Sequence, residues 1–505
     1  MNKKIMFFIY IFLFLFADIN SVTADSFYEK RNSIKLSINE CLKLALEKNI
    51  EIKIARLDPE IQNHKIINAK ADFDPLIRID IQNHDEKHKP ITFLSGVGWE
   101  RDYKNLSQEK IEYDINLAKK LITGGTFSLS FLNSRLRTNS LFSFYDETYS
   151  NDIVFSLKQP LLRNLGKNNN TYRITINKNH LKVSQNKVQH KIMEVVNRVQ
   201  KMYWELLYSK EYLKVSELSL ELSTELLKRN KALHKEGRIT RVEIIQAEVE
   251  VASREEGILI AENQLLINSD RLANYLNLTK EFKRDDIIIP EGKPIFIKDE
   301  INPDKCLRIA KEKRPEILEA KINLKNLEIT SKITKNQLLP KLDLVSSFTL
   351  NGYGGSESRS LDDTLDDNTR IWSAGIVFEY PLGNRKAFSE YSKLKIELEK
   401  AKRELTLLEK RIELEVIESI RNIETNLKRI DTCNKRTKVA TKRLEIEKEK
   451  LELGMSTTVQ VLDFQEDLTK ALDKENRAII DYQQSLINLD LATAQILEKN
   501  NVIIE

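Results

Sequence analysis

The sequence predicts a mainly α-helical, internally duplicated chain with a small β-barrel part. Two observations indicate long helices: only 14 Gly and 10 Pro interrupt 505 residues, and 31% of the residues are charged. A third observation indicates the duplication, because the sequence matches itself when one half is shifted onto the other.

Composition excludes several classes of function. Lys plus Arg (81) nearly balance Asp plus Glu (76), so the net charge of +5 does not indicate a nucleic-acid partner. Cys41, Cys306 and Cys433 are too few and too scattered for a disulfide scaffold or a zinc site. The sequence contains no HExxH, GxxxxGK[ST] or GxSxG motif. We therefore expect no catalytic residue, no metal site and no cofactor.

The first 24 residues have the pattern of a secretory signal peptide. Lys3 and Lys4 precede the apolar run 5–16, and cleavage is predicted after Ala24. A membrane anchor is the alternative, but the run falls short of the ~20 apolar residues that a bilayer requires. No other stretch approaches that length, so a mature chain that enters a membrane must do so as strands of a closed barrel.

The exported chain is predicted to consist of two repeats. Cys41-Leu42-Lys43-Leu44-Ala45 matches Cys306-Leu307-Arg308-Ile309-Ala310 at an offset of 265 (306 minus 41). Later in the chain the offset is smaller, because Pro160 matches Pro381 and Gly237 matches Gly454. The predicted division is a signal peptide at 1–24, a first repeat at 25–280, a linker at 281–300 and a second repeat at 301–505.

Each repeat is predicted to contain one very long helix. Seventy residues without Gly or Pro separate Gly166 from Gly237, and seventy more separate Gly383 from Gly454. Apolar residues in the first run recur every seven positions, the spacing of a coiled coil: Ile192, Val199, Leu206, Leu213, Leu220 and Leu227. A 65-residue helix spans ~100 Å, so two shorter helices must stack end to end beside it. Those shorter segments are 38–72 and 241–278 in the first repeat, and 305–338 and 458–497 in the second.

Period-two alternation beside the paired prolines predicts strands with one apolar face. The alternating segments are 77–81, 153–157, 342–350 and 372–380. The first repeat carries an insertion of 44 residues here, since Pro75 to Pro160 spans 85 residues and Pro340 to Pro381 spans 41. A hairpin is predicted at 111–133, and we expect it to extend a loop or the barrel rim, because four strands already match between the halves. Two strands per half leave unpaired edges, so several chains must pool them.

The ordered set of motifs resembles the outer-membrane efflux protein family, the TolC-like channels. The resemblance covers nearly the whole mature chain and is carried by Leu36–Asn49, Gln159–Leu162, Tyr380–Leu382 and the helix tips Gly237–Val242 and Gly454–Val459. It implies a homotrimer in which twelve pooled strands form one transmembrane β-barrel in the outer membrane. It also implies that the long helices form a coiled-coil α-barrel in the periplasm.

The same resemblance implies the function of an outer-membrane channel. Such a channel is the exit duct of a tripartite efflux or type I secretion system, and it passively conducts what an inner-membrane pump delivers through a periplasmic adaptor, or membrane fusion protein. Two alternatives belong to other classes. A periplasmic adaptor would carry one hairpin between Gly-rich β modules, and a structural coiled-coil protein would lack the alternating strands.

Site residues follow from the resemblance, position by position. It implies adaptor docking at the tips, through Gly237, Arg238, Thr240 and Val242 in the first and Gly454, Thr457 and Val459 in the second. The alternative for the glycines is that they only end helices.

The resemblance also implies a periplasmic constriction. Two acids narrow the pore in such channels, and Gln460 and Asp463 stand at those positions, so cation affinity should be weaker. Glu243 matches the acid that latches the closed tip, but its Tyr and Arg partners are replaced by Leu451 and Ser456. Arg238 and Arg241 are candidate substitute cations, and a solvated helix face is the alternative for Glu243.

Overall fold

A computed structural model describes residues 31–89, 105–140, 143–278, 283, 286–292, 300–366 and 369–502. The predicted signal peptide at 1–24 lies outside these residues. The chain divides into two compact units, and each draws on both predicted repeats. Unit 1 comprises Met1–Leu57, Asn186–Leu318 and Thr406–Glu505, and unit 2 comprises Asp58–Gln185 and Glu319–Leu405.

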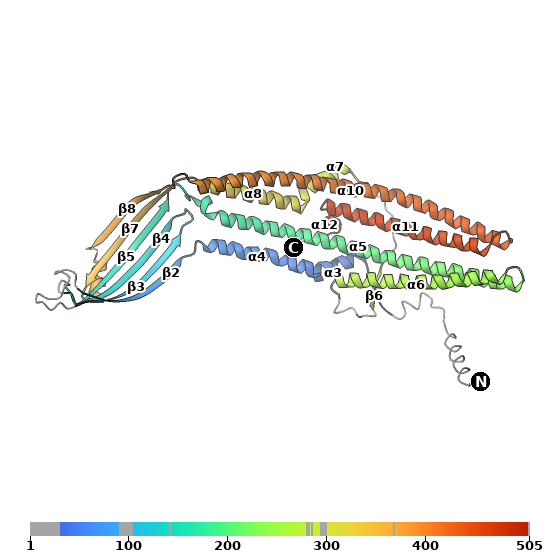
Figure 1. Cartoon of the computed structure of the whole chain (residues 1–505), viewed down its shortest axis with the longest axis horizontal. Coiled ribbons are helices and arrows are strands. Elements are labelled where there is room, and N and C mark those ends of the chain that lie inside the picture. Colours follow the sequence, from blue (N-terminus) through green and yellow to red (C-terminus); the bar gives the residue numbers. More distant parts are fainter. Residues whose placement is uncertain are drawn as a thin grey trace, which may run out of the picture. The chain divides into compact units, whose positions relative to one another are not determined.

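Helices and strands follow one another in the chain in nearly the same order in both halves (Figure 1). The first half contains β1 (Asn32–Leu36), α3 (Ile38–Lys48), α4 (Ile50–Ala71), β2 (Leu76–His88), β3 (Leu106–Lys120), β4 (Thr126–Thr138), β5 (Glu147–Pro160), α5 (Lys167–Lys235), α6 (Arg241–Tyr275) and β6 (Asp286–Pro290). The second half contains α7 (Pro303–Lys313), α8 (Pro315–Asn336), β7 (Lys341–Gly354), α9 (Glu357–Leu365), β8 (Arg370–Glu379), α10 (Arg385–Glu452), α11 (Thr458–Ala492) and α12 (Ile496–Lys499).

Unit 2 is built around a six-stranded antiparallel sheet with the strand order β2-β3-β4-β5-β7-β8 (Figure 1). Directly paired residues share a face of the sheet, so one row of partners can be followed across all six strands. That row is apolar throughout: Ile77, Leu117, Leu129, Phe155, Phe348 and Trp372. The neighbouring row on the other face contains mostly small polar residues: Leu76, Ala118, Ser128, Ser156, Ser347 and Ser373. The sheet therefore has one apolar and one largely polar face.

The expectation for the inserted hairpin at 111–133 is wrong. Its strands β3 and β4 do not extend a loop or a rim but lie inside the sheet, between β2 and β5. Both are paired on two sides, β3 with β2 and β4, and β4 with β3 and β5. The comparison of the two halves could not detect this, because the second half has no counterpart of the hairpin.

Helix α9 packs on the apolar face of the sheet near the ends of β5 and β7. Asn151 Nδ2 donates to Ser360 Oγ (2.9 Å), and Ser360 Oγ donates to the carbonyl of Gly352 (2.9 Å). Thr364 Oγ1 donates to the carbonyl of Asn151 (3.1 Å). A Cβ at residue 352 would lie 2.3 Å from the Ser360 carbonyl oxygen, so this close approach requires glycine.

Unit 1 is a helical bundle with a core contributed by both halves. The first four residues of the predicted heptad in α5, from Ile192 to Leu213, are almost fully buried. Toward the end of α5 the buried face moves by one position, to Ser219, Ser223, Leu226 and Asn230, and so becomes largely polar. Leu226 packs with Leu444, Leu451, Val461 and Leu468 of α10 and α11. The two long helices therefore share a core near their ends.

The first shorter helix of each repeat is broken at one residue, which was not expected from the sequence pattern. Segment 38–72 divides into α3 and α4 at Asn49, and segment 305–338 divides into α7 and α8 at Arg314. Asn49 and Arg314 both have extended backbone angles, with ψ of 130° and 122°. The expected end-to-end stacking is present in the first repeat, because Asn49 Nδ2 donates to the carbonyl of Tyr275, where α6 ends (2.9 Å).

The predicted linker at 281–300 contains structure that joins the core. Its residues 286–290 form β6, which pairs in parallel with β1. Ile287 and Ile288 are fully buried in the main apolar cluster of unit 1. Their apolar side chains explain why this segment is held in place.

Within the described part of the chain, no helix is long and apolar enough to cross a membrane.

Candidate functional site: the helix tips

The first tip joins α5 to α6 through a glycine with left-handed backbone angles. Gly237 has φ of +73°, and its N–H donates to the carbonyl of His234 (2.9 Å). The N–H of Arg238 donates to the carbonyl of Leu233 (3.0 Å). These two bonds form a Schellman motif, which ends a helix and satisfies its last carbonyls.

The second tip repeats this geometry between α10 and α11. Gly454 has φ of +74°, its N–H donates to the carbonyl of Leu451 (3.2 Å), and the N–H of Met455 donates to the carbonyl of Lys450 (2.8 Å). A Cβ at Gly237 or at Gly454 would meet no atom within 4 Å. Both glycines are therefore required by their backbone angles and not by lack of space.

The residues that start the outgoing helices differ between the tips. Thr457 caps α11 through a capping box, in which its hydroxyl accepts from the Gln460 N–H (3.4 Å) and the Gln460 side chain accepts from the Thr457 N–H (3.3 Å). Thr240 occupies the same position before α6 without a side-chain capping bond. Gln460, predicted at the constriction, thus also fixes the start of α11.

A buried polar cluster connects the two tips. Thr458 Oγ1 donates to Glu243 Oε2 (3.0 Å) and accepts from Asn230 Nδ2 (3.0 Å), which also lies 3.3 Å from the Glu243 carbonyl oxygen. The Asn230 and Thr458 side chains are fully buried. We name Asn230, Glu243 and Thr458 the tip triad. Glu243 itself is half-buried, and one of its carboxylate oxygens is bound by the second repeat.

The predicted substitute cations do not pair with Glu243. Arg238 lies 3.7 Å from Glu236, and both side chains are more than half exposed. In the described ranges no ion pair joins Glu243 to Arg238 or Arg241. Sequence reasoning missed Asn230 and Thr458 because the resemblance pointed to charged partners. The signal that would have found them is a polar residue in the apolar pattern of its helix: Asn230 lies three residues after Leu227, and Thr458 three before Val461.

A second polar contact closes the tip between α10 and α11. Ser456 Oγ donates to Glu447 Oε1 (2.6 Å), and Lys450 Nζ lies 3.3 Å from Glu447 Oε2. The hydrogen bond from Ser456 lowers the pKa of the Glu447 carboxyl, and Lys450 adds to this shift. Ser456 stands where the resemblance implies an Arg that would pair with Glu243. Its hydroxyl instead binds Glu447, an acid of its own hairpin.

Asp463 lies on an exposed face of α11. Gln460 and Asp463 are exposed, whereas Val461, Gln465 and Leu468 on the other side of the helix are buried. The exposed face continues to Asp467, four residues beyond Asp463, which sequence reasoning missed. Extending the spacing by one helical turn would have found it. The face thus carries two acidic residues.

The predicted docking residues at the tips include exposed apolar side chains. Val242 is 60% exposed and Val459 is 45% exposed. Leu453 and Met455 beside Gly454 are 70% and 75% exposed, and sequence reasoning missed both. Apolar side chains that remain exposed at a helix turn are available for contact with another protein.

Two exposed apolar seams at heptad spacing lead away from the tips. The first seam lies on α6 and consists of Val242, Ile245, Val249 and Leu259. The second lies on α10, with Val439 and Ile446, and continues to Leu453 directly after the end of that helix. Apolar residues seven apart are the contact positions of coiled coils. Both seams are exposed in the single chain, so each lacks the helix that would cover it.

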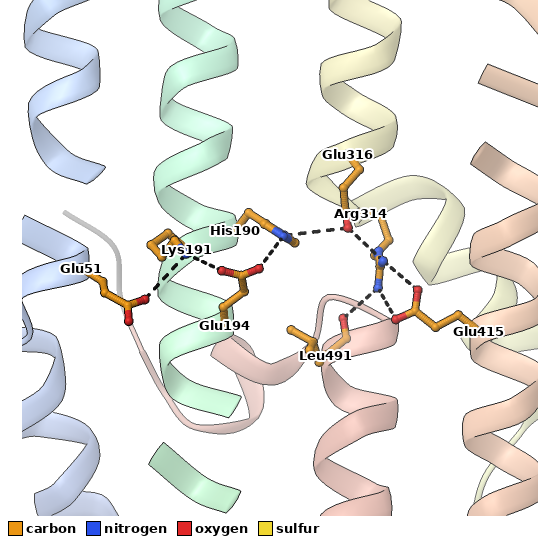
Figure 2. A network of polar contacts seen from close by, with 8 residues as sticks. All are labelled: Glu51, His190, Lys191, Glu194, Arg314, Glu316, Glu415 and Leu491. Atoms are coloured by element: carbon orange, nitrogen blue, oxygen red, sulfur yellow. Dashed lines mark hydrogen bonds and ion pairs between the residues drawn. The ribbon is translucent and has the colours of Figure 1, made fainter. Parts of the chain in front are cut away.

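A polar network farther along unit 1 joins the two repeats (Figure 2). Arg314 Nη2 lies 2.9 Å from Glu415 Oε2 and 2.9 Å from Glu316 Oε1. The network continues through His190 and Glu194 to Lys191, whose pKa is raised by its hydrogen bond to Glu194, and ends at Glu51. It holds α5 to the second repeat.

Among the described residues, no group of His, Cys, Asp and Glu is arranged to bind a metal ion.

Comparisons with known proteins agree on one family. The sequence model described as "Outer membrane efflux protein" matches residues 126–278 and 306–495. The structure is similar to the outer-membrane channel OprN, with a TM-score of 0.66 and 12% identity over 91% of this chain and 90% of that one. It is also similar to the Campylobacter jejuni CmeC outer membrane channel, with a TM-score of 0.63 and 14% identity over 91% and 85%. The open state of the Neisseria gonorrhoeae MtrE outer membrane channel gives 0.61 and 15% over 91% and 89%. No curated protein sequence matches the chain significantly.

Proposed function

The chain belongs to the outer membrane efflux protein family, and from this premise we propose that it is the outer-membrane exit duct of a tripartite efflux or type I secretion system. The observation that carries the proposal is the six-stranded sheet of unit 2. One of its faces presents an apolar row to its surroundings and the other a mostly small polar row, as the wall of a water-filled barrel in a lipid bilayer requires.

The duct is a homotrimer in this proposal. A sheet in a bilayer cannot leave its edges unpaired, and within the described residues β2 and β8 each pair on one side only. The exposed apolar seams on α6 and α10 also need a partner, because apolar residues at heptad spacing are normally covered by a neighbouring helix. Copies of this chain supply both partners.

The tips dock on a periplasmic adaptor, through which an inner-membrane pump delivers the cargo. Each chain presents two tips with the same Schellman geometry, at Gly237 and Gly454. Exposed Val242, Met455 and Val459 supply an apolar contact surface there. The chain then acts as a passive channel and not as an enzyme.

The constriction of the channel lies at the exposed face of α11 in this proposal. Three copies place three Asp463 and three Asp467 carboxylates around one axis, where they attract cations. The tip triad of Asn230, Glu243 and Thr458 holds the closed arrangement, since it links α5 and α6 to the start of α11.

The test is to express the full chain and extract it from outer membranes in detergent. We expect a particle with the mass of three chains, and discrete conductance steps when it is added to planar bilayers. A monodisperse soluble monomer, or a membrane-bound trimer that gives no conductance, would contradict the proposal. If the chain were instead a periplasmic adaptor, it would bind the pump but give no conductance steps in planar bilayers.

A further inference from the structure

We infer that the inserted hairpin widens the channel: three copies of the six-stranded sheet form an eighteen-stranded barrel in place of the twelve strands that four per chain would give. This inference rests on the proposed trimer. It concerns the part of the channel that lies in the membrane, and so the largest object that this part can pass.

The first argument is that β3 and β4 are complete members of the sheet. Leu129 of the hairpin lies directly between Leu117 and Phe155 in the apolar row. Ser128 lies directly opposite Ser156 in the polar row. The hairpin therefore continues both faces of the sheet without a break, which a loop folded away from the wall would not do.

The second argument is that the turn of the hairpin is anchored. Thr123 Oγ1 lies 2.9 Å from Gln159 Oε1, and the N–H of Gly166 donates to the Thr123 carbonyl (2.9 Å). Gly124 has φ of +97°, and a Cβ there would lie 2.4 Å from the Asn164 carbonyl oxygen. The turn is thus packed against the segment that connects β5 to α5.

The third argument concerns the edges that remain. With all six strands antiparallel, β2 and β8 run in opposite directions, so β8 of one copy can pair antiparallel with β2 of the next. Each edge is exposed and carries apolar side chains, such as Ile81 on β2 and Phe378 on β8. The same contact repeated around an axis closes a ring.

The duplication also gives the register of this contact. Within one chain the two halves meet where Pro160 pairs with Asp343. Pro381 is the counterpart of Pro160, and Arg78 is the counterpart of Asp343, since Pro75 matches Pro340. Between copies, Pro381 should therefore face Arg78. In an antiparallel pair this register brings Phe378 opposite Ile81, and both lie on the apolar face.

The consequence is a wider lumen. The diameter of a barrel grows roughly in proportion to its number of strands, so eighteen strands give a width about 1.5 times that of twelve. Barrels of 16–18 strands leave an open aqueous channel. The membrane part of this duct is then wide enough that the helical part, and not the barrel, limits the size of the cargo.

The edge contact is tested by disulfide cross-linking in the full-length protein in outer membranes. The variant with I81C and F378C should form covalent dimers and trimers under oxidising conditions, seen on non-reducing gels after boiling. The matched control combines I81C with V377C, whose sulfurs face opposite sides of the sheet, and should remain monomeric after boiling. The three native cysteines are free, so the unsubstituted chain serves as the background. Cross-linking that is absent from the first variant, or equal in both, would overturn the edge contact.

The hairpin's place in the wall is tested by labelling with a membrane-impermeant maleimide. Single cysteines at Ser128 and Leu129 test the hairpin, and cysteines at their direct partners Ser156 and Phe155 serve as references. We expect S128C and S156C to be labelled, and L129C and F155C to be protected by lipid. Labelling of both hairpin positions, with the β5 pair behaving as expected, would overturn the eighteen-stranded barrel. Labelling of all four would instead contradict the proposed membrane channel.

Discussion

Asn49 and Arg314 stand at equivalent positions of the two repeats and make equivalent contacts. Each ends the first short helix of its repeat, and each donates to a carbonyl at the end of the return helix. Asn49 Nδ2 lies 2.9 Å from the Tyr275 carbonyl oxygen, and Arg314 Nη1 lies 3.3 Å from the Ala492 carbonyl oxygen. A short amide and a long guanidinium thus solve the same problem, the unpaired carbonyls of a helix end.

The first prediction concerns Arg314, which is buried and also binds Glu415 through both of its terminal nitrogens. Arg314→Met leaves the Ala492 carbonyl without its donor, so we expect a loss of about 1.5–3 kcal/mol in the free energy of unfolding. Thermal unfolding of the purified protein measures the change. Lys311→Met is the control, because the exposed Lys311–Glu413 pair contributes at most about 1 kcal/mol. Equal losses in both variants would contradict the role of Arg314.

The second prediction concerns docking at the tips. Bulky replacements at Gly237 and Gly454, such as Gly→Val, should leave trimer level and heat resistance near normal and abolish export in cells. The strain of a left-handed residue is local, about 1–2 kcal/mol at each tip. Gly257→Val is the matched control, since Gly257 on α6 also has open space around its Cα but lacks a positive φ, and export should persist. An equal loss of trimer would assign the tip glycines to folding alone.

How far the sequence predicts this molecule depends on which residues repeat. Gly237 and Gly454 were found because each ends a 70-residue run, and Schellman geometry follows from the chemistry of glycine. The break at Asn49 was missed, because a helix broken at one residue leaves the apolar period nearly unchanged on either side. The break at Arg314 does carry a signal, since Pro315 restricts the residue before it to extended angles and is the first residue of α8. The hairpin β3–β4 was found as strands but misplaced, since pairing between distant strands is a tertiary property. The tip triad was missed because Asn230 and Thr458 carry no charge.

The third prediction concerns the constriction. Asp463→Ala should weaken block by multivalent cations in single-channel recordings on planar bilayers, because it removes one of the two proposed acidic rings. Asp463→Ala combined with Asp467→Ala should weaken the block further. Glu445→Ala, an exposed acid on α10, is the control and should leave the block unchanged. Unchanged block in the double variant would show that the constriction lies elsewhere.

The fourth prediction concerns the tip triad. Thr458→Val keeps the shape of the side chain but removes the hydroxyl that joins Asn230 to Glu243, at a cost of about 1–3 kcal/mol for the groups left unpaired. We expect the fraction of time spent open to rise in bilayer recordings. Thr469→Val is the control, because Thr469 Oγ1 binds only a carbonyl of its own helix, at Glu466. A gating change of the same size in the control would contradict the role of the tip triad in holding the channel closed.

The fifth prediction concerns pH. Because the pKa of Glu447 is lower in the folded protein than its usual value of 4.5, the contact with Ser456 stabilises the second tip above that value. The stabilisation is lost as the pH falls through the lowered pKa. Amide hydrogen exchange at 450–456 should therefore accelerate in acid below about pH 4.5, relative to the intrinsic rate. Ser456→Ala should reduce this dependence on pH, and an unchanged profile would rule out Glu447 as its source.

The hairpin β3–β4 adds two strands, and this even number has a consequence for how such sheets can change in evolution or in design. In this sheet β5 ends, and α5 starts, at the same end at which β2 begins. A single inserted strand would reverse the direction of β5, and α5 would then start from the other end. A pair of strands preserves every later direction, and the helices on both sides keep their places. Adding a hairpin to the sheet therefore leaves unchanged the end of the sheet from which each flanking helix starts. The connection between β7 and β8 has the same parity, so grafting a second hairpin there would give a chain with eight strands and unaltered helices.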